Sequence, residues 1–170
     1  MPVTPRVLFL CTGNAARSVM AGAMLEAQGA TVRVTTAGTH VVEHQPISVR
    51  TRDALRSLGL EAPRHRSRQL TDDEVGAADL VVAMAAEHVL YVRRRHGAGA
   101  DRTATLPYLA PRLPPGIGPL AQRVGTLGLA TVDPAVQGDV ADPAGGGDED
   151  YLACAREVAA LVGELAPRLG

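Results

Sequence analysis

RVLFLCTGNAARSVM, residues 6–20, is the stretch of sequence that decides the fold. Its first six residues form a nearly continuous apolar run, which is typical of a strand buried on both faces. Polar and small residues interrupt the run directly after Cys11. From Ser18 onward apolar residues recur at helical spacing until Gly29, a residue type that commonly follows a helix. The stretch therefore predicts a strand, a tight loop and a helix.

The same alternation continues along the rest of the chain. β-Branched and apolar runs predict further strands over residues 31–37, 79–84 and 103–106. Helical spacing predicts helices over residues 47–58, 86–96 and 148–169, and Thr71 with Glu74 forms a capping box that starts a short helix. Residues 107–119 contain five prolines and two glycines, so we expect a loop there, followed by a short helix to about Leu127.

Alternating strands and helices predict a three-layer α/β fold, with a four-stranded parallel sheet flanked by helices on both faces. The length of 170 residues fits one domain that spans residues 1–170. Ligands of such sheets bind at the carboxyl ends of the strands, and the loop after the first strand is the usual place. We therefore expect the functional site at residues 11–18.

Composition excludes several classes of function. The formal net charge is −1, with 17 basic and 18 acidic side chains, which does not suit a nucleic-acid-binding surface. The apolar runs have the length of strands rather than of membrane spans, and the N-terminus lacks the pattern of a signal peptide. Cys11 and Cys154 are too few for a disulfide framework. We expect a cytoplasmic protein that binds neither nucleic acid nor membrane.

The loop Cys11–Ser18 has the residue types that bind a tetrahedral anion and attack it. A loop that leads into a helix N-terminus directs backbone N–H groups inward, and Gly13 and Asn14 tolerate the positive φ angles that such a loop demands. Arg17 offers a planar fork for two phosphoryl oxygens. A thiolate is favoured beside Arg and a helix N-terminus, so Cys11 is the expected nucleophile, and Ser18 can donate a hydrogen bond to it.

These residues resemble the opening of the low-molecular-weight protein tyrosine phosphatases, especially those of bacteria. Members of that family begin with an apolar strand followed by Cys-x-Gly-Asn-x-x-Arg-Ser, which residues 11–18 match. Further similarities follow in order along nearly the whole chain. They are Thr36-Ala37-Gly38-Thr39, the stretch from His65 to Thr71, the strand at residues 78–84, and Asp139-Val140-Ala141-Asp142-Pro143 as the general-acid loop.

The resemblance implies hydrolysis of a phosphate monoester in two steps through a cysteinyl-phosphate. It assigns Cys11 as nucleophile, Arg17 as phosphate clamp and Asp142 as general acid and base. It also implies support of Asn14 by Ser18, Thr36 and His65. The remaining loop positions, whose backbone would bind phosphate, are Thr12, Gly13, Ala15 and Ala16. No metal or cofactor is implied, and the expected protein is a monomer or weak dimer.

Several positions depart from the pattern of that family. Ala16 stands where a second loop cysteine is usual, which removes the partner for a protective disulfide with Cys11. Ala144 replaces the aromatic residue that usually forms a pocket wall after Asp-Pro, Ala15 stands at the opposite wall, and Ala85 replaces an Asp after the third strand. His40 and Ala144 are expected at the pocket rim. With three Tyr and one Phe in the chain, an aromatic slot for phosphotyrosine is not evident.

Three other functions are compatible with parts of the sequence, and a fourth, arsenate reduction, does not fit it. Some bacterial members of the family act on phosphoarginine, although they carry Thr and Phe at the positions of Ala15 and Ala144. A small phosphorylated metabolite would suit an open pocket, whereas arsenate reduction would need further cysteines, which residues 79–100 lack. An inactive phosphate-binding or phosphoprotein-binding module is the alternative outside enzymes, disfavoured because all catalytic roles are filled.

Two further motifs have simpler explanations. His40-Val41-Val42-Glu43-His44 matches the spacing of a metalloprotease motif, but it follows Gly38-Thr39 and lacks helical character, so we expect a loop at the pocket rim rather than a metal site. The arginines of residues 64–68 and 93–95 are expected on solvated surfaces and at a helix end, where they could also attract acidic segments around a phosphorylation site.

Overall fold

The computed structural model describes residues 3–170 and contains a four-stranded parallel sheet. Its strands are β1 (Arg6–Cys11), β2 (Arg33–Gly38), β3 (Leu80–Ala83) and β4 (Thr103–Thr105), in the order β2-β1-β3-β4. Cys11 pairs with Gly38 at the end of β1 and β2, and Leu10 pairs with Ala83 of β3. The first strand is therefore central, and its carboxyl end opens where the strand order reverses, as expected for a ligand site of this architecture.

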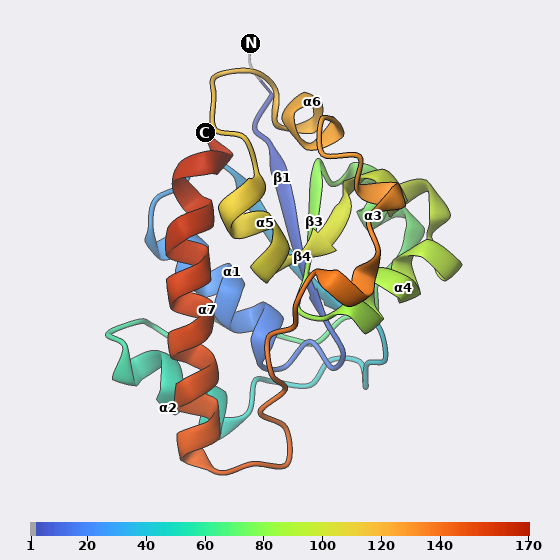
Figure 1. Ribbon diagram of the computed structural model, residues 1–170. Coiled ribbons are helices and arrows are strands. Elements are labelled where there is room, and N and C mark those ends of the chain that lie inside the picture. Colours follow the sequence, from blue (N-terminus) through green and yellow to red (C-terminus); the bar gives the residue numbers. More distant parts are fainter. Residues whose placement is uncertain (1–2) are drawn as a thin grey trace.

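Helices cover both faces of the sheet, which confirms the expected three-layer architecture (Figure 1). One face carries α1 (Arg17–Ala27), α2 (Val49–Ser57), α5 (Leu106–Arg112) and α7 (Asp148–Leu169), and the other carries α3 (Asp72–Ala77) and α4 (Ala86–Arg95). A further short helix, α6 (Leu120–Gly125), precedes the 3-10 turns Leu129–Thr131 and Pro134–Val136, and a 3-10 segment Gly97–Arg102 precedes β4.

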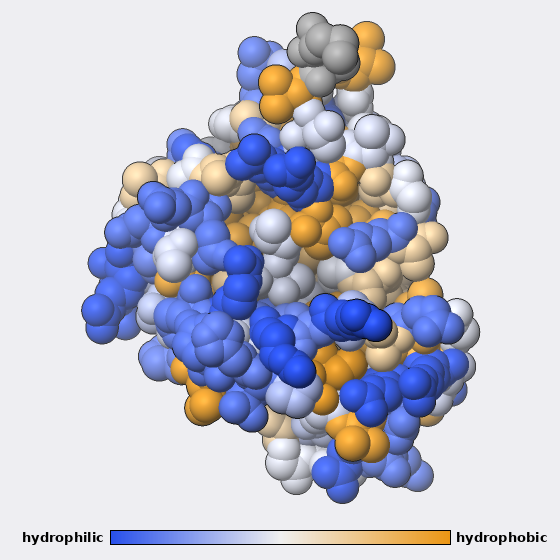
Figure 2. Space-filling model, turned by 180° about the vertical axis from the view of Figure 1, so that it is seen from behind, coloured by the Kyte–Doolittle hydropathy of each residue, from blue (hydrophilic) through white to orange (hydrophobic). Residues whose placement is uncertain are grey.

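Strand β1 divides the hydrophobic core into two clusters. Val7, Phe9 and Cys11 face the larger cluster beneath α1, α5 and α7, and Leu8 and Leu10 face the smaller cluster beneath α3 and α4. Alternate side chains of a strand point to opposite faces, so a strand covered on both faces must be apolar throughout. Figure 2 shows hydrophilic residues over most of the molecule's rear face, around smaller hydrophobic areas. No helix within residues 3–170 combines the length and apolar composition of a membrane span.

The expectation of a loop over residues 107–119 is wrong for its first half, because α5 occupies residues 106–112. Pro107 lies in the first helical turn, where a missing N–H removes no intrahelical bond. The Thr105 hydroxyl accepts a hydrogen bond from the Tyr108 N–H at 3.3 Å and caps the helix. Leu106, Leu109 and Ala110 are buried on one face, and this packing stabilises the helix despite Pro111 near its end.

The other expected elements are present, with ends that differ by a few residues. The capping box of Thr71 and Glu74 starts α3, and α7 has the expected bounds. The second strand starts at Arg33 rather than residue 31, and the helix expected over residues 47–58 covers Val49–Ser57 after an N-cap at Ser48. Such shifts at element ends are common because the terminal residues satisfy only part of the hydrogen-bond pattern.

Candidate active site

The loop from Cys11 to Arg17 closes around the carboxyl end of β1. Cys11 ends β1 and Arg17 begins α1, so five residues connect a buried strand to a helix N-terminus. The backbone N–H groups of residues 13–16 donate no hydrogen bond to any described residue. A Cβ added at Gly38 of the neighbouring strand would lie 2.5 Å from the Thr12 carbonyl oxygen and 3.0 Å from the Asn14 nitrogen. The loop thus needs glycine beside it and presents unused amide donors to an anion.

Asn14 holds the loop in shape from inside the protein. It is fully buried and adopts a left-handed backbone with φ of 51°. Its side-chain oxygen accepts from the Arg68 backbone N–H at 3.0 Å, and its Nδ2 donates to Ser18 Oγ at 2.9 Å. His65 Nε2 lies 2.6 Å from the Asn14 carbonyl oxygen, so this ring nitrogen is the donor. These contacts offset the cost of positive φ for a residue other than glycine.

The Cys11 sulfur and the Ser18 hydroxyl form a buried pair. Cys11 Sγ lies 3.0 Å from Ser18 Oγ. Because Ser18 Oγ already accepts the hydrogen bond from Asn14 Nδ2, the serine hydrogen is free to be directed at the sulfur. A hydroxyl donor stabilises sulfur in its negatively charged form. The chain Asn14–Ser18–Cys11 therefore couples the shape of the loop to a sulfur suited to nucleophilic attack.

Arg17 reaches back across the loop and is 4% exposed. Its Nη1 donates to the Val140 carbonyl oxygen at 3.1 Å, and its Nη2 lies 3.4 Å from Thr12 Oγ1. The same Nη2 lies 3.4 Å from Asp142 Oδ2, in a pair whose acidic partner is half exposed. A buried guanidinium held on several sides is a fixed positive charge at the loop, available to two oxygens of a tetrahedral anion.

The segment that carries Asp142 is anchored to the sheet and to α4. The Val140 N–H donates to the Met84 carbonyl oxygen at 2.7 Å, directly after β3. Asp139 Oδ1 accepts from the Ala86 N–H at 2.7 Å, at the first residue of α4. The Ala144 N–H donates to Asp142 Oδ1 at 3.0 Å and forms a turn around the carboxylate. These bonds bring Asp142, distant in sequence, beside the loop of residues 11–17.

His88 of α4 touches the loop from the opposite side. It is 1% exposed, and its Nε2 lies 2.9 Å from Thr12 Oγ1. Its Nδ1 is buried and has no hydrogen-bond partner among the described residues. Burial, followed by the nearby positive charge of Arg17, lowers the pKa of His88 to about 4, against the opposing charges of Asp142 and Asp139. The ring is therefore neutral at neutral pH.

We expect this burial to make the protein less stable in acid. Between pH 6.5 and about 4 the unfolded chain binds a proton at His88 that the native state does not, so the free energy of unfolding falls as pH falls. Over this pH range His88 should lower the free energy of unfolding by about 3 kcal/mol. Denaturant unfolding at a series of pH values measures it. His88→Gln should reduce the slope in this window, and His44→Asn, at an exposed histidine, should not.

The slope will not vanish in the His88→Gln variant. Burial also lowers the pKa of His65, ahead of the opposing hydrogen bond to the Asn14 carbonyl, and this adds a slope of the same sign. An unchanged slope in His88→Gln would show that His88 already binds its proton in the native state near pH 6.5. The neutral ring beside Thr12 would then be disproved.

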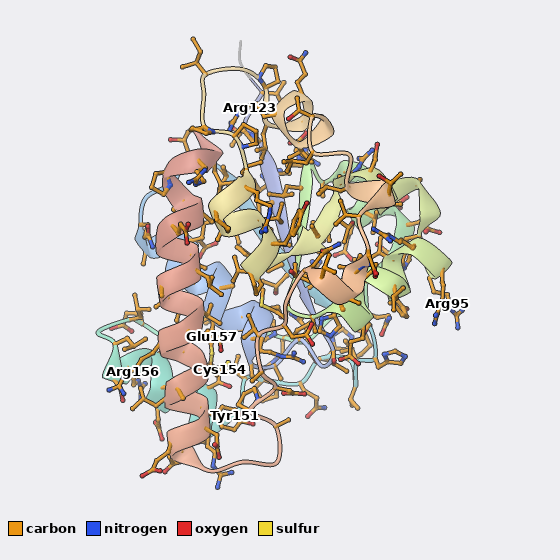
Figure 3. All side chains as sticks on the ribbon, viewed as in Figure 1. Arg95, Arg123, Tyr151, Cys154, Arg156 and Glu157 are labelled. Atoms are coloured by element: carbon orange, nitrogen blue, oxygen red, sulfur yellow. The ribbon has the colours of Figure 1, made fainter. Side chains whose placement is uncertain are left out.

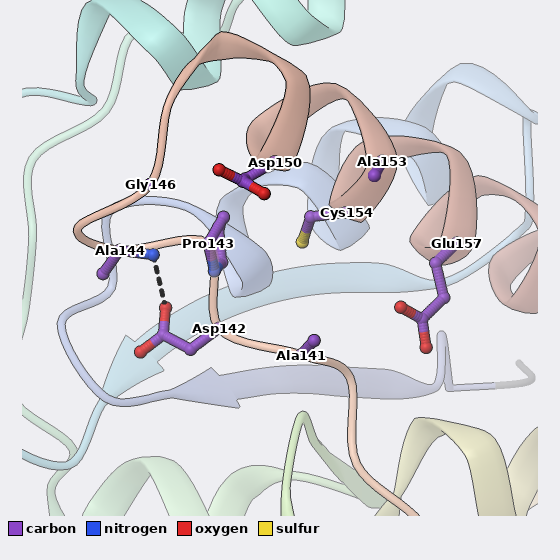
Figure 4. A pocket seen from close by; sticks show the side chains of 9 residues that line it. All are labelled: Ala141, Asp142, Pro143, Ala144, Gly146, Asp150, Ala153, Cys154 and Glu157. Atoms are coloured by element: carbon purple, nitrogen blue, oxygen red, sulfur yellow. Dashed lines mark hydrogen bonds between the residues drawn. The ribbon is translucent and has the colours of Figure 1, made fainter.

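Two cavities, each of about 370 Å³, lie near the loop, one lined by Asp142 and the other by Thr12. The first is formed by residues 141–146 and the adjacent face of α7, from which Asp150, Cys154 and Glu157 face it (Figure 4). Three carboxylates line this cavity, those of Asp142, Asp150 and Glu157. Partial burial raises the pKa of Glu157. The second lies between the loop and α4, beside Thr12 and His40. Arg17 Nη2 contacts Asp142 of the first cavity and Thr12 of the second.

The structure brings most of the expected site residues together, with three differences. Thr36 makes no side-chain hydrogen bond to Asn14 among the described residues, and only its carbonyl oxygen accepts from Arg68, at 3.3 Å. The φ angle of Gly13 is not positive. Within the loop, only Asn14 has a positive φ. The two expected rim residues are separated, because Ala144 lines the first cavity and His40 the second.

The segment from His40 to His44 forms a loop that ends in a turn. His44 has φ of 66°, which is outside the helical region, so the two histidines do not share a helix face. Its Glu43 carboxylate instead accepts from the Gln69 N–H at 2.9 Å. Cys154 is buried and faces the first cavity, and burial raises the pKa of its thiol to about 12.

Sequence reasoning missed several residues that shape the site. Thr51 Oγ1 of α2 donates to the Ala15 carbonyl oxygen at 3.1 Å. His88 and Asp139, described above, act across separations of 76 and 53 residues from their partners. No local pattern marks such contacts, because they arise only when distant segments pack. The approach of Gly38 to the loop could have been inferred, because consecutive strands of such a sheet are commonly neighbours.

Comparison with known proteins places this site in a wider context. Residues 6–111 match the family described as low molecular weight phosphotyrosine protein phosphatase. The chain is 35% identical to a protein-arginine-phosphatase of Geobacillus stearothermophilus over 165 residues, which cover 96% of this chain and 95% of the relative. It is 34% identical to a low molecular weight protein-tyrosine-phosphatase of Streptomyces coelicolor, over 96% of this chain and 93% of the relative.

A solved structure shows the same fold. The chain superposes on the YwlE arginine phosphatase from Geobacillus stearothermophilus with a TM-score of 0.79 and 32% identity, covering 97% of this chain and 92% of that one. The similarity extends beyond residues 6–111 and includes the segment that carries Asp142. The chain is thus similar over nearly its whole length to proteins named for the removal of phosphate.

Proposed function

We propose a reaction and a substrate for this chain, which belongs to the low-molecular-weight phosphotyrosine protein phosphatase family and is a cysteine-dependent phosphatase. The reaction is the two-step removal of phosphate from a phosphorylated protein side chain, through a phosphate bound to Cys11. The observation that carries it is the geometry around one anion site, where Cys11 Sγ, the unused amides of residues 13–16 and Arg17 converge.

In the first step Cys11 attacks phosphorus. The sulfur forms a bond to phosphorus while the bond from phosphorus to the leaving group breaks. Loop amides and the Arg17 guanidinium hold the equatorial oxygens, where negative charge is spread in the transition state. Asp142, 3.4 Å from Arg17 in the unliganded site, gives its proton to the leaving atom. The products are the free side chain and cysteinyl-phosphate.

In the second step water attacks phosphorus and the bond from phosphorus to sulfur breaks. Asp142, now a carboxylate, takes a proton from the water as it attacks. Ser18 stabilises the departing Cys11 thiolate through the hydroxyl that lies 3.0 Å from Sγ. Inorganic phosphate leaves and the cycle returns to its starting state. The reaction needs a reduced cysteine, so we propose that it takes place in the cytoplasm.

For the substrate we propose phosphoarginine in proteins. The first cavity is lined by Asp142, Asp150 and Glu157, which gives negative charge next to the segment of the proposed general acid. A guanidinium leaving group is a cation and is favoured there, because carboxylates pair with it by charge and geometry. Ala144 leaves the cavity open, and none of its described lining residues is aromatic. The full-length similarity to the Geobacillus protein-arginine-phosphatase supports the same substrate.

Phosphotyrosine is the second candidate. The match of residues 6–111 and the full-length similarity to the Streptomyces protein-tyrosine-phosphatase favour it. A tyrosine ring, however, is usually held by apolar or aromatic side chains. Here the residues beside the ring would be small, namely Ala15 in the loop and Ala144 in the segment that carries Asp142. A phosphotyrosine substrate would therefore lose contact area at both walls.

Phosphate release from two peptides of the same sequence tests the choice. One peptide carries phosphoarginine and the other phosphotyrosine at the same position, and p-nitrophenyl phosphate reports the reaction itself. We expect a higher kcat/KM for phosphoarginine, and a loss of that preference in Asp150→Asn/Glu157→Gln. A preference for phosphotyrosine would overturn the substrate. Absence of metal-independent turnover for all three compounds would overturn the reaction.

Peroxide should inactivate the enzyme with poor recovery. Hydrogen peroxide converts the Cys11 thiolate to a sulfenic acid, which needs a nearby thiolate to form a protective disulfide. Ala16 supplies none, and Cys154 stays protonated because burial raises its pKa to about 12. Activity is measured after prolonged peroxide and then dithiothreitol. Ala16→Cys should restore recovery by adding a partner in the loop, and full recovery of the natural sequence would contradict the prediction.

A further inference from the structure

The second cavity has its own walls and its own charge, although it borders the catalytic loop. It lies between Thr12 of the loop, the residues that follow β2, and one face of α4. That face carries residues at positions 87, 88, 91, 94 and 95, which helical spacing places on one side. The cavity begins at the Thr12 hydroxyl, which Arg17 Nη2 also approaches. A substrate bound to Arg17 therefore has this cavity beside it.

The middle of the cavity is built from fixed groups. Gln69 Nε2 donates to the Thr39 carbonyl oxygen at 2.6 Å and to the Tyr91 hydroxyl at 3.0 Å. The rings of His40 and Tyr91 meet edge to face, with centroids 5.4 Å apart. Gln69 thus links the residue after β2 to α4 and sets the distance between these two walls of the cavity. A cavity with such cross-links keeps its shape before a ligand arrives.

Two unpaired cations lie at the far end of the cavity. The side chains of Arg94 and Arg95 are exposed and form no hydrogen bond or ion pair with any described residue. The preceding Arg93 differs, because its Nη2 donates to the carbonyl oxygens of Leu129 and Val132, both at 2.7 Å. Arg93 therefore has a structural role, whereas Arg94 and Arg95 have none in the protein itself.

The other ionisable groups do not cancel this charge. Glu87 is the acidic residue of the lining, and it lies at the opposite end, where its Oε1 is 3.4 Å from Thr12 Oγ1. His88 is neutral at neutral pH because burial lowers its pKa to about 4. His40 adds no negative charge. The end of the cavity at Arg94 and Arg95 is thus positive, and it favours a carboxylate.

We propose that this cavity is a substrate subsite that binds an acidic side chain near the phosphorylated residue of the target protein. From His88, beside Thr12, to Arg94 and Arg95 the helix rises by about 10 Å. An extended chain covers about 3.4 Å per residue, so the acidic residue lies about three positions from the phosphorylated one, within a range of two to four. The proposal rests on the proposed function, since it places a protein substrate at Cys11.

The two cavities then have complementary tasks. Arg17 approaches one lining residue of each cavity and binds the phosphate, the negative cavity lined by Asp142 receives the leaving group, and the positive cavity receives a neighbouring carboxylate. Favourable contacts at Arg94 and Arg95 are remote from the reacting atoms. Their binding energy therefore raises kcat/KM for one sequence context over another, which is selection among phosphorylation sites.

The test compares two phosphopeptides that differ only in charge. Both carry the same phosphorylated residue, and one has Glu where the other has Gln at positions two to four residues away on either side. The ratio of their kcat/KM values is the readout, so a general loss of activity cancels. We expect the natural sequence to prefer the Glu peptide about three- to tenfold, less at high salt. The ratio should fall to about one in Arg94→Gln/Arg95→Gln.

A matched control separates a local subsite from the overall charge of the protein. Arg156 of α7 is exposed like Arg95 but lies on the opposite side of the molecule (Figure 3). Arg156→Gln should keep the preference for the Glu peptide. Arg94→Glu/Arg95→Glu should reverse it, toward a peptide with Lys at the same positions. An equal loss of preference in Arg156→Gln and the double variant would overturn the subsite, as would a ratio of one in the natural sequence.

Failure of the proposed function would be visible separately. If p-nitrophenyl phosphate is hydrolysed but neither phosphopeptide is, the protein does not act on phosphorylated proteins of this kind. The same peptides are then used as inhibitors of p-nitrophenyl phosphate hydrolysis. Tighter inhibition by the Glu peptide, lost in Arg94→Gln/Arg95→Gln, would still support the cavity as a carboxylate site. Equal inhibition by both peptides would overturn it.

Discussion

Cys11→Ser is expected to abolish turnover of every substrate while the fold persists. The loss in kcat should be at least roughly 10⁴-fold, because a serine hydroxyl is a far weaker nucleophile than a thiolate. Any phosphoserine that forms would be a stable ester, since an alkoxide leaves phosphorus less readily than a thiolate. At most one substrate molecule per chain should therefore react. Phosphate release and intact-protein mass, followed over many equivalents of substrate, measure both quantities.

The fold of this variant can be verified independently. Serine fits the space of Cys11, which is 3% exposed, and its hydroxyl can keep the contact with Ser18. The variant should unfold at nearly the same denaturant concentration as the natural sequence and should still bind inorganic phosphate at the loop. Cys154→Ser makes the same chemical change at the other buried thiol and should retain turnover. Repeated turnover by Cys11→Ser would exclude Cys11 as the nucleophile.

The sequence predicts this fold well where local and global preferences agree. Residues 7–11 are apolar because their strand is central, and Thr71 with Glu74 marks a helix start through a contact three residues apart. The segment at residues 106–112 fails for the opposite reason. Its prolines indicate a loop locally, yet Pro107 occupies a helical position that needs no N–H, and burial of Leu106 and Leu109 supplies stability that composition does not reveal.

The candidate site divides in the same way. Cys11, Asn14, Arg17 and Ser18 lie within eight consecutive residues, so their cooperation follows from the loop itself. Asp142 and His65 were named only through the family resemblance, because nothing local distinguishes them from turn or surface residues. The contacts of His88 and Thr51 with the loop span 76 and 36 residues and depend on how α4 and α2 pack. Contacts between such distant residues leave no periodic pattern in the sequence from which they could be predicted.

The charge division between the two cavities also emerges only in three dimensions. Asp150 and Glu157 look like ordinary exposed residues of an amphipathic helix, and Arg94 and Arg95 like basic residues at a helix end, favoured by its dipole. Packing of α7 and α4 on opposite faces of the sheet places the acidic residues in the cavity lined by Asp142 and the basic residues in the cavity lined by Thr12. The charge of each cavity therefore depends on topology rather than on the catalytic loop alone.

Asp142→Asn should slow the reaction in proportion to how much the leaving group needs a proton. We expect kcat/KM, which reports transfer of phosphate to Cys11, to fall roughly 10²- to 10⁴-fold for phenyl phosphate and much less for p-nitrophenyl phosphate. Nitrophenolate leaves without protonation, whereas phenolate needs it. Asparagine keeps the size of the side chain and can accept the hydrogen bond from the Ala144 N–H, so the turn should persist.

The difference between the two substrates, rather than the loss itself, identifies the role. Removing the Asp142 carboxylate also removes its pairing with Arg17, 3.4 Å away, and any effect of that change on phosphate binding is shared by both substrates. Asp139→Asn is the matched control, because Asp139 lies in the same segment but bonds the first N–H of α4. Its losses should be equal for the two leaving groups. Equal losses in Asp142→Asn as well would assign Asp142 to positioning of Arg17, and the proton donor would have to be another group.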